Sequence, residues 1–179
     1  GASGSGKSTL CSILNKYITD YTGDILFGTM NYKDLSIKTI RDNIVYVGQN
    51  ENIFTGSIKE NITFGHEVSD LDFNKVCNIC KVDDIAYKKT FRYESLIGSD
   101  EGNISGGEKQ RIILARAVLK DFNVLILDEA LSEVDIKLEL EILKNIRDNY
   151  KDKTIIYISH KKYPNVFDKV ISMEAVWTI

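Results

Sequence analysis

The chain has 179 residues, a length that fits one domain or one domain with a subdomain. Hydrophobic residues make up 43% and charged residues 27%, a balance that excludes a disordered chain. The net charge of −3 shows no basic bias for a broad nucleic-acid surface, and no apolar run approaches the ~18 residues of a membrane span. We therefore expect a globular protein without a nucleic-acid partner.

A glycine-rich motif of the form G-x-x-x-x-G-K-S runs from Gly1 to Ser8. Glycines let a backbone wrap closely around phosphates, and the N–H groups of such a loop point inward as an anion site. Lys7 would supply a cation for the β- and γ-phosphates, and Ser8 a hydroxyl for Mg²⁺. The amphipathic helix behind the loop favours this interpretation over a flexible glycine–serine turn. The predicted ATP-binding residues are Gly1, Ser3, Gly4, Gly6, Lys7, Ser8 and Thr9.

The N-terminal half predicts a helix over Lys7–Ile18 and strands over Asp24–Phe27 and Ile44–Val47. The buried face of the first helix would carry Leu10, Ile13, Leu14, Tyr17 and Ile18. Residues 50–115 are more polar and interrupt the alternation of predicted strands and helices, which indicates an inserted, mostly helical subdomain. Its main helices are predicted over Asp70–Lys81 and Gly106–Lys120. The core of the domain would then comprise residues 1–49 and 116–179.

The C-terminal half continues with a strand over Val124–Leu127, apolar on both faces as parallel sheets require. An amphipathic helix over Asp135–Asn149 and a buried strand over Thr154–Ser159 follow. The inward face of that helix would carry Leu138, Ile142, Leu143 and Ile146. Strands that alternate with helices behind a phosphate loop predict an α/β fold of the P-loop NTPase type, a RecA-like core with a mainly parallel sheet.

Two acidic residues, Asp128 and Glu129, follow the strand Val124–Leu127. Ligands of open α/β sheets bind at the carboxyl edge of the strands, where these side chains are expected. Asp128 is placed to organise Mg²⁺, directly or through water. Glu129 is the candidate general base that polarises the water attacking the γ-phosphate. An acid after an apolar strand is commonly just a solvated strand end, but the phosphate loop favours the catalytic interpretation.

Three cysteines are present, and two of them, Cys77 and Cys80, form a lone C-x-x-C. A zinc site would need two more ligands, and neither His66 nor His160 stands at a recognisable zinc spacing. We therefore interpret the pair as thiols on the flank of a helix in a reducing cytosol.

The segment Asn103–Arg111, with the sequence NISGGEKQR, resembles the signature motif of the ATP-binding-cassette (ABC) family. It is a second glycine-rich helix start whose hydroxyl and N–H groups suit a γ-phosphate. In that family the phosphate belongs to a partner subunit, so the resemblance implies a head-to-tail dimer with a second ATP-binding domain. The residues implied to hold the partner's ATP are Ser105, Gly106, Gly107 and Glu108. Taken alone, the motif would equally be a simple helix cap.

Three further motifs match the family in order along the chain. Gln49 looks like the glutamine of the Q-loop, which implies contact with Mg²⁺ and the attacking water. The stretch Ser132–Asp135 looks like the D-loop of the dimer interface, and His160 like the switch histidine. The resemblance covers essentially the whole chain and implies catalytic roles for Glu129, His160 and Gln49. It implies Mg²⁺ ligation by Ser8, Gln49 and Asp128, and a helical subdomain of the ABC ATPase type.

The sequence of residues 40–49 and 53–62 is similar to the Q-loop region of exporters. In exporters the ATPase is commonly fused behind its own membrane domain, so we expect such a domain upstream and a location at the cytoplasmic face of a membrane. The segment Gly98–Gly102, with Asp100 and Glu101, stands where exporters carry an acidic loop that touches the membrane domain. Residues 103–111 look most like peptide or bacteriocin exporters.

The chain departs from the family pattern at several positions. Ile104 and Glu108 replace a leucine and a glutamine of the signature, and Glu133 replaces a small residue of the D-loop. The family's strand leading into the phosphate loop and its adenine-stacking aromatic would lie upstream of Gly1. We expect these 179 residues alone to fold poorly and bind ATP weakly.

Two other classes of protein share parts of this pattern. Soluble ABC-type ATPases of DNA repair or translation would show a long coiled coil or basic arms. A nucleotide-switch module would not need the intact pair Asp128 and Glu129 together with His160. An ATP hydrolase that powers export is the interpretation that uses all of the motifs.

Overall fold

The computed structural model describes residues 4–98, 104–161, 163 and 166–173. Three parallel strands form the central sheet in the order β3-β6-β7, with β3 at Ile44–Val47, β6 at Val124–Asp128 and β7 at Thr154–Ile158. The first residues of the three strands lie side by side in the register. The predicted parallel α/β fold is confirmed.

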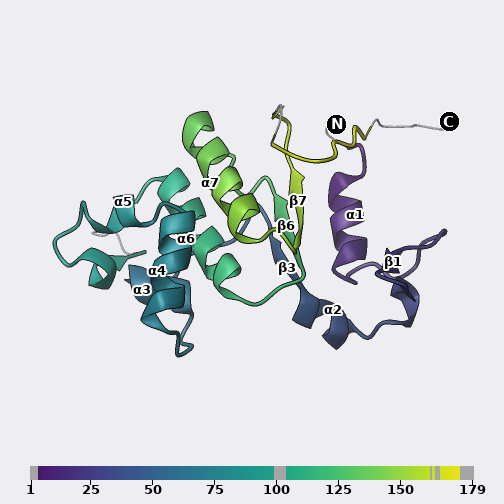
Figure 1. Cartoon of the computed structure of the whole chain (residues 1–179), viewed down its shortest axis with the longest axis horizontal. Coiled ribbons are helices and arrows are strands. Elements are labelled where there is room, and N and C mark those ends of the chain that lie inside the picture. Colours follow the sequence, from purple (N-terminus) through teal and green to yellow (C-terminus); the bar gives the residue numbers. More distant parts are fainter. Residues whose placement is uncertain (1–3, 99–103, 162, 164–165, 174–179) are drawn as a thin grey trace.

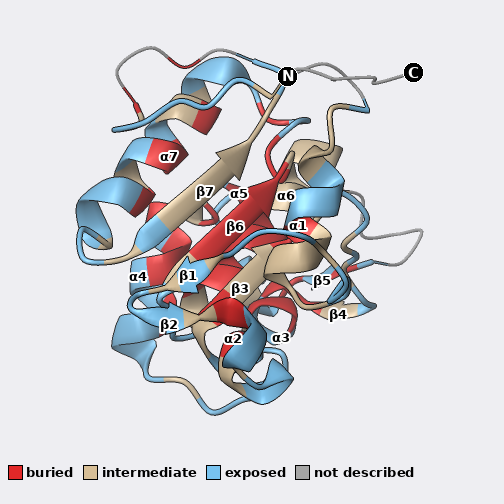
Figure 2. Cartoon of the chain, turned by 90° about the vertical axis from the view of Figure 1, so that its right-hand side faces the viewer, coloured by how far each residue is buried: buried red, intermediate tan, exposed pale blue. Residues whose placement is uncertain are grey.

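Helices cover both faces of this sheet (Figure 1). Leu125 and Leu127 of β6 pack into the larger hydrophobic cluster, on the side of α6 (Gly106–Leu119) and α7 (Ile136–Asn149). Ile126, between them, points to the opposite face and joins a smaller cluster with Cys11 of α1 (Lys7–Leu14). The middle strand is therefore buried on both faces, as its continuous apolar run predicts (Figure 2).

Helix α1 is shorter than predicted and buries only part of its predicted face, where Leu14 packs on the cluster of Cys11. It ends at Leu14 because Lys16 has a left-handed backbone, with φ of 54°. Cys11 is its one buried residue, and Leu10, at roughly 100° from Cys11 around the helix, is 39% exposed. The remaining predicted face includes two residues beyond the helix, Tyr17 and Ile18, which are 69% and 38% exposed, so that part of the prediction is wrong.

The predicted strand Asp24–Phe27 is only partly right. The structure contains a short β1 at Leu26–Phe27, which pairs antiparallel with β2 at Met30–Asn31 outside the central sheet. The turn η1 (Tyr32–Asp34) and helix α2 (Ile37–Asn43) then lead into β3. Ser36 caps α2 by accepting a hydrogen bond from the N–H of Thr39 at 2.9 Å.

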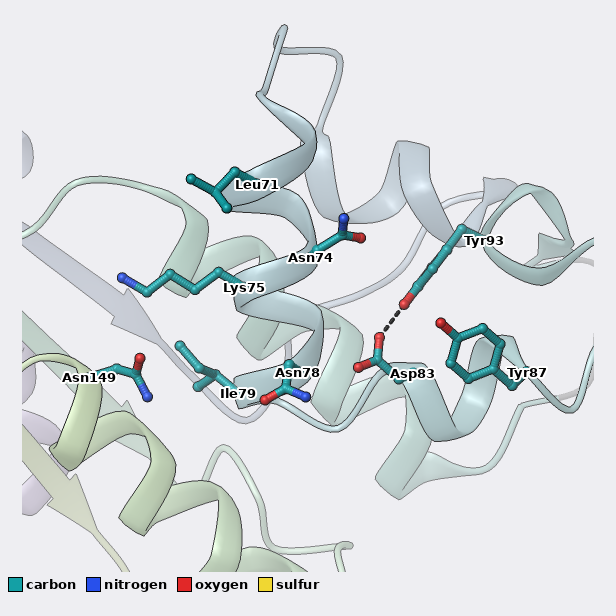
Figure 3. A pocket seen from close by; sticks show the side chains of 9 residues that line it. All are labelled: Leu71, Asn74, Lys75, Asn78, Ile79, Asp83, Tyr87, Tyr93 and Asn149. Atoms are coloured by element: carbon teal, nitrogen blue, oxygen red, sulfur yellow. Dashed lines mark hydrogen bonds between the residues drawn. The ribbon is translucent and has the colours of Figure 1, made fainter.

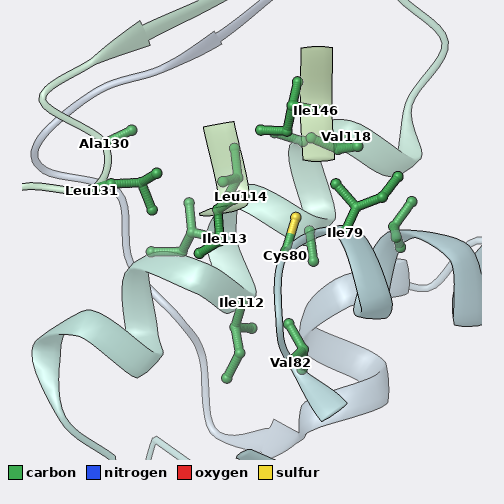
Figure 4. Close-up of a cluster of buried hydrophobic side chains, with 14 of the residues drawn as sticks. Ile79, Cys80, Val82, Ile112, Ile113, Leu114, Val118, Ala130, Leu131 and Ile146 are labelled. Carbon is green, nitrogen blue, oxygen red and sulfur yellow. The ribbon is translucent and has the colours of Figure 1, made fainter. Parts of the chain in front are cut away.

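The segment between β3 and β6 is mostly helical, as predicted. It contains β4 (Gly56–Ser57), α3 (Ile58–Thr63), α4 (Asp70–Ile79), α5 (Asp83–Ala86), η2 (Arg92–Glu94) and β5 (Leu96–Ile97), followed by α6. Helix α6 packs on α3, α4 and β3, so it joins this segment to the sheet. The division at residues 49/50 and 115/116 stays an interpretation, because one hydrophobic cluster runs through both parts (Figure 4).

Helix α7 confirms most of its predicted face: Ile142, Leu143 and Ile146 are buried, and Leu138 is partly buried. Cys77 and Cys80 are also buried, inside the same cluster. None of the described helices has both the length and the apolar character needed to cross a lipid bilayer.

Candidate nucleotide site

The glycine loop ends at the start of α1. Gly4 and Gly6 have φ of 78° and 88°, a conformation that favours glycine over residues with side chains. The first bond of the helix runs from the N–H of Leu10 to the carbonyl of Gly6 at 2.9 Å, so the N–H groups of Ser8 and Thr9 have no carbonyl partner within the helix. An anion at this end would also meet the positive pole of the helix dipole. The predicted loop residues Gly1 and Ser3 lie outside the described residues.

The first turn of α1 carries two exposed hydroxyl groups and the ammonium of Lys7. Ser8 and Thr9 are exposed, and the ammonium of Lys7 lies 3.3 Å from the hydroxyl of Ser5, within the loop. The described part of the loop thus offers the donors that the motif predicts: a cation, hydroxyls and backbone N–H groups.

Asp128 ends the central strand beneath α1. Its side chain is buried, and Oδ2 accepts a hydrogen bond from the hydroxyl of Tyr46 on β3 at 3.1 Å. Burial and the charge of Asp128 raise the pKa of Tyr46, so the phenol keeps the proton that it donates. Burial also raises the pKa of Cys11 on α1 to about 11, with the charge of Asp128 as a second cause. Asp128 therefore lies within electrostatic reach of the helix that follows the phosphate loop.

Tyr46 is a site residue that the motifs did not reveal. It follows Ile44 at the spacing of two residues that places both side chains on one face of a strand. Both belong to the cluster beneath α1, on the same side as Cys11. The alternation in the strand Ile44–Val47 could have placed Tyr46 on that side, but not against Asp128 in particular.

Glu129 and His160 meet at the ends of two neighbouring strands. Nε2 of His160 lies 2.7 Å from Oε1 of Glu129. The N–H of Glu129 donates to the carbonyl of Ile158 at 3.0 Å, which fixes the Glu129 backbone to the end of β7. Glu129 has φ of 54°, so the chain turns sharply after Asp128 and presents the two carboxylates separately. Two residues predicted from separate motifs are thus in contact.

Gln49 follows β3 at the same edge of the sheet and is exposed. Within the described residues its side chain makes no hydrogen bond to Asp128 or Ser8. Its share in a metal site and in catalysis stays a prediction.

The oxygen ligands at this edge fit Mg²⁺. Ser8 and Asp128 offer a hydroxyl and a carboxylate, the hard donors that Mg²⁺ prefers. The described residues contain no group of three or more His, Cys, Asp or Glu side chains that could hold a metal ion by themselves.

The signature segment starts α6 with a capping box. The hydroxyl of Ser105 accepts from the N–H of Glu108 at 3.3 Å, and Oε2 of Glu108 accepts from the N–H of Ser105 at 2.9 Å. Burial opposes the charge of Glu108, but the hydrogen bonds from Ser105 outweigh it and lower the pKa of the carboxyl group. The carboxylate that replaces the family's glutamine is therefore turned back onto its own helix. Asn103 lies outside the described residues, as do Asp100 and Glu101 of the predicted acidic loop.

The D-loop packs against the signature helix of the same chain. Gln110 on α6 donates to the hydroxyl of Ser132 at 3.1 Å and accepts from the N–H of Glu133 at 2.9 Å. A side chain at Gly106 would begin 1.9 Å from Oε2 of Glu133, so glycine is required there while this carboxylate keeps its position. Asp135 accepts from the N–H of Lys137 at 2.9 Å and caps α7. The two predicted interface motifs therefore form one surface.

A cavity of the described structure lies away from this sheet edge. It has a volume of about 430 Å³ and sits in the helical segment, between α4, α5, η2 and the end of α7 (Figure 3). Its lining includes Lys75, Asn78, Tyr87 and Asn149, and Tyr93 donates a hydrogen bond to Asp83 at its edge. None of the predicted nucleotide residues lines it, and it opens widely to solvent. The sheet edge, which carries Asp128, Glu129 and His160, stays the candidate nucleotide site.

A parallel sheet between helices, with a glycine loop leading into α1 and acidic residues at the adjacent strand end, defines the class of P-loop NTPases. A family model described as "ABC transporter" matches residues 1–132. The chain therefore belongs to the ABC transporter family.

Curated relatives and a solved structure support this membership of the ABC transporter family. The chain is 39% identical over 165 residues to the lactococcin-G-processing and transport ATP-binding protein LagD of Lactococcus lactis subsp. lactis, covering 89% of this chain and 23% of LagD. It is 40% identical over 165 residues to a putative export ATP-binding/permease protein of Rickettsia felis, covering 90% and 28%. The structure of a bacterial Atm1-family ABC exporter with ATP bound matches with a TM-score of 0.81 and 28% identity, covering 90% and 28%.

The chain spans about a quarter of the length of the curated relatives that it matches, between 22% and 28%.

Proposed function

We propose that this chain binds Mg-ATP and hydrolyses it to power export across a membrane, as the ATPase domain of an ABC exporter. The contact between Glu129 and His160, next to the buried Asp128, carries the proposal. A general base must stand within hydrogen-bond reach of the proton it takes, and a phosphoryl transfer needs cations and donors around the γ-phosphate. This strand edge brings both kinds of group together.

Each residue then has a defined task. The loop residues Gly1, Ser3, Gly4, Gly6 and Thr9, with Lys7, bind and orient the triphosphate. Ser8, Asp128 and Gln49 would hold Mg²⁺, which when bound neutralises phosphate charge. Glu129 orients the attacking water and accepts its proton, while His160 donates to the γ-phosphate. Tyr46 keeps Asp128 in place through its hydrogen bond.

We infer the partners of this chain from the same arrangement. We assign the surface of Ser105, Gly106, Gly107 and Glu108, with Ser132 and Asp135, to a second ATP-binding domain in a head-to-tail dimer. A membrane domain would couple to the helical segment, with this chain at the cytoplasmic face. The relatives support export: LagD is a lactococcin-G-processing and transport ATP-binding protein, and a Mesorhizobium japonicum relative, 33% identical, is a β-(1→2)glucan export ATP-binding/permease protein. Among cargoes, the resemblance to LagD favours a peptide.

The substitution Glu129→Gln in the complete gene product tests the proposed function. We expect ATP binding to persist and phosphate release to fall by about 10² to 10⁴, because the base is lost while the shape of the site remains. The matched control is Glu67→Gln, at an exposed loop position, which should release phosphate at the unaltered rate. Unchanged hydrolysis in Glu129→Gln would remove Glu129 from the role of base. Nucleotide binding without any phosphate release by the unaltered protein would favour a nucleotide switch instead.

A further inference from the structure

A buried carboxylate outside the proposed catalytic set lies beneath the segment that carries His160. Glu139, in the first turns of α7, has a side chain only 1% exposed. Its Oε1 accepts hydrogen bonds from the hydroxyls of Tyr157 and Tyr163, the second at 2.5 Å. Its Oε2 accepts from the ammonium of Lys161 at 2.8 Å. Because an ionised group in a protein interior is costly unless its lone pairs are satisfied, this arrangement of three donors specifies one geometry.

Both chain neighbours of His160 are tied to this carboxylate. Lys161 reaches it directly through its ammonium. Ser159 reaches it through Tyr163: the two hydroxyls lie 3.1 Å apart, and Tyr163 donates to Glu139. The N–H of Lys161 donates to the hydroxyl of Ser159 at 3.0 Å and closes a turn around His160. The backbone that aims the imidazole is therefore held from both sides.

The imidazole itself has little packing to hold it. The His160 side chain is 52% exposed, and the interaction that the structure gives it within the described residues is the 2.7 Å contact with Glu129. An exposed side chain on a turn samples several rotamers unless its backbone is fixed. Since misplacement by about 1 Å can cost a large factor in rate, the fixing of the turn affects chemistry.

The donors around Glu139 hold their protons firmly. The hydrogen bond and charge of Glu139 raise the pKa of Lys161. Burial, followed by the hydrogen bond to Glu139, raises the pKa of Tyr157 and of Tyr163. These three donors therefore keep the protons that they donate at neutral pH.

We propose that Glu139 is a positioning residue for ATP hydrolysis: through Lys161 and the hydroxyls of Tyr163 and Ser159 it fixes the turn that aims His160. The inference rests on the proposed function, because it assigns a task within hydrolysis. Glu139 touches neither Glu129 nor His160, so it acts through the backbone on each side of His160. It also joins His160 to α7, the helix that the D-loop residue Asp135 caps.

Two substitutions in the complete gene product test this. Glu139→Gln keeps the size of the side chain and removes the charge, and Lys161→Met breaks the same pair from its 40% exposed end. We expect each to lower kcat by on the order of tenfold. The Kd for ADP, which has no γ-phosphate, should not change. The matched control is Glu141→Gln, also on α7, whose exposed carboxylate pairs with Lys81 at 2.7 Å and which should keep the unaltered kcat.

A double-substitution cycle separates positioning from a merely structural role. If Glu139 acts through His160, Glu139→Gln should lower kcat no further once His160→Ala is present. Losses that multiply, or an unaltered kcat in both Glu139→Gln and Lys161→Met, would overturn the inference. Should Glu139→Gln fail to fold, as judged by circular dichroism, the kcat of Lys161→Met with and without His160→Ala decides by the same criteria.

A readout without turnover completes the test. Diethyl pyrocarbonate modifies exposed imidazoles, and mass spectrometry can compare His160 with the exposed His66 as an internal reference. We expect the ratio of modification at His160 to that at His66 to rise in Glu139→Gln and Lys161→Met and to stay constant in Glu141→Gln. A constant ratio in all three would count against the inference even if hydrolysis is confirmed. Absence of hydrolysis by the unaltered protein would overturn the proposed function and the inference together.

Discussion

Glu133 places a negative charge on the surface that we assign to the partner's ATP. Its Oε2 lies against the backbone of Gly106, the first residue of α6, so close that a side chain at Gly106 would begin 1.9 Å away. Gln110 holds the backbone of Glu133 in this position by accepting a hydrogen bond from its N–H. A carboxylate here opposes the approach of a phosphate to the same helix start, because like charges repel at short range.

The substitution Glu133→Gln should therefore tighten ATP-dependent dimer formation. Removing one repulsion worth about 1 kcal/mol corresponds to about a fivefold lower dissociation constant. Analytical ultracentrifugation with ATP in a Glu129→Gln background, where hydrolysis does not reopen the dimer, measures it. Added salt should reduce the difference between the proteins with and without the Glu133→Gln substitution, since screening weakens the repulsion. Weaker dimerisation of the substituted protein would show that the carboxylate makes a favourable contact across the interface.

At the level of single residues, the motifs predicted groups whose position follows from strand order. Glu129 and His160 follow the ends of neighbouring parallel strands, and parallel strands bring their carboxyl ends to one edge of a sheet. Tyr46 and Glu139 were not predicted as functional residues, because their roles depend on which side chains lie across a helix or strand from them. That information is contained in the packing and not in local spacing.

Individual elements were predictable where their apolar pattern is long. Strand β6 and helix α7 lie close to their predicted bounds, because each buries a continuous or periodic apolar face. The predicted strand Asp24–Phe27 was only partly right. Its short apolar run pairs with the other strand of a hairpin outside the central sheet, and such pairing depends on tertiary contacts. The end of α1 at Leu14 likewise depends on Lys16, whose ammonium bonds the carbonyls of Leu35 and Lys33.

The C-terminal turn of α4 gives a prediction about thiol chemistry. Burial raises the pKa of Cys77 to about 12, with the charge of Asp83 as a second cause, and burial raises the pKa of Cys80 as well. The thiolate is the reactive form, so at pH 7 to 9 Cys77 should have a thiolate fraction about a thousandfold below that of a free cysteine. We expect iodoacetamide to label both slowly in the folded protein and readily in urea, as mass spectrometry would show.

A cysteine introduced by Asn78→Cys is the matched control for that labelling. Position 78 is exposed on the same helix, between the two buried thiols, so it should react at the rate of an ordinary thiol. Rapid labelling of native Cys77 or Cys80 at pH 8 would contradict the structural interpretation and revive a redox or metal role for the C-x-x-C.

At the scale of the whole molecule, the central sheet is poorly covered along its edge strand β7. Within the described residues β7 pairs with β6 alone, and its isoleucines Ile155, Ile156 and Ile158 are only partly buried. Leu10 of α1 is also 39% exposed. Backbone groups and apolar side chains at a sheet edge are stabilised by a further strand or a covering segment.

We therefore predict that adding a segment before Gly1 that pairs with the open side of β7 tightens ATP binding and raises the unfolding temperature relative to these 179 residues alone. The extension would give the open side of β7 partners and support the phosphate loop beside it, and binding to a site that is already held in place costs less conformational entropy. Titration of both forms with a fluorescent ATP analogue measures the difference. Lys7→Ala in each form is the control that shows binding through the phosphate loop. Equal and tight binding by both forms would mean that three parallel strands are enough to hold the loop in its binding conformation.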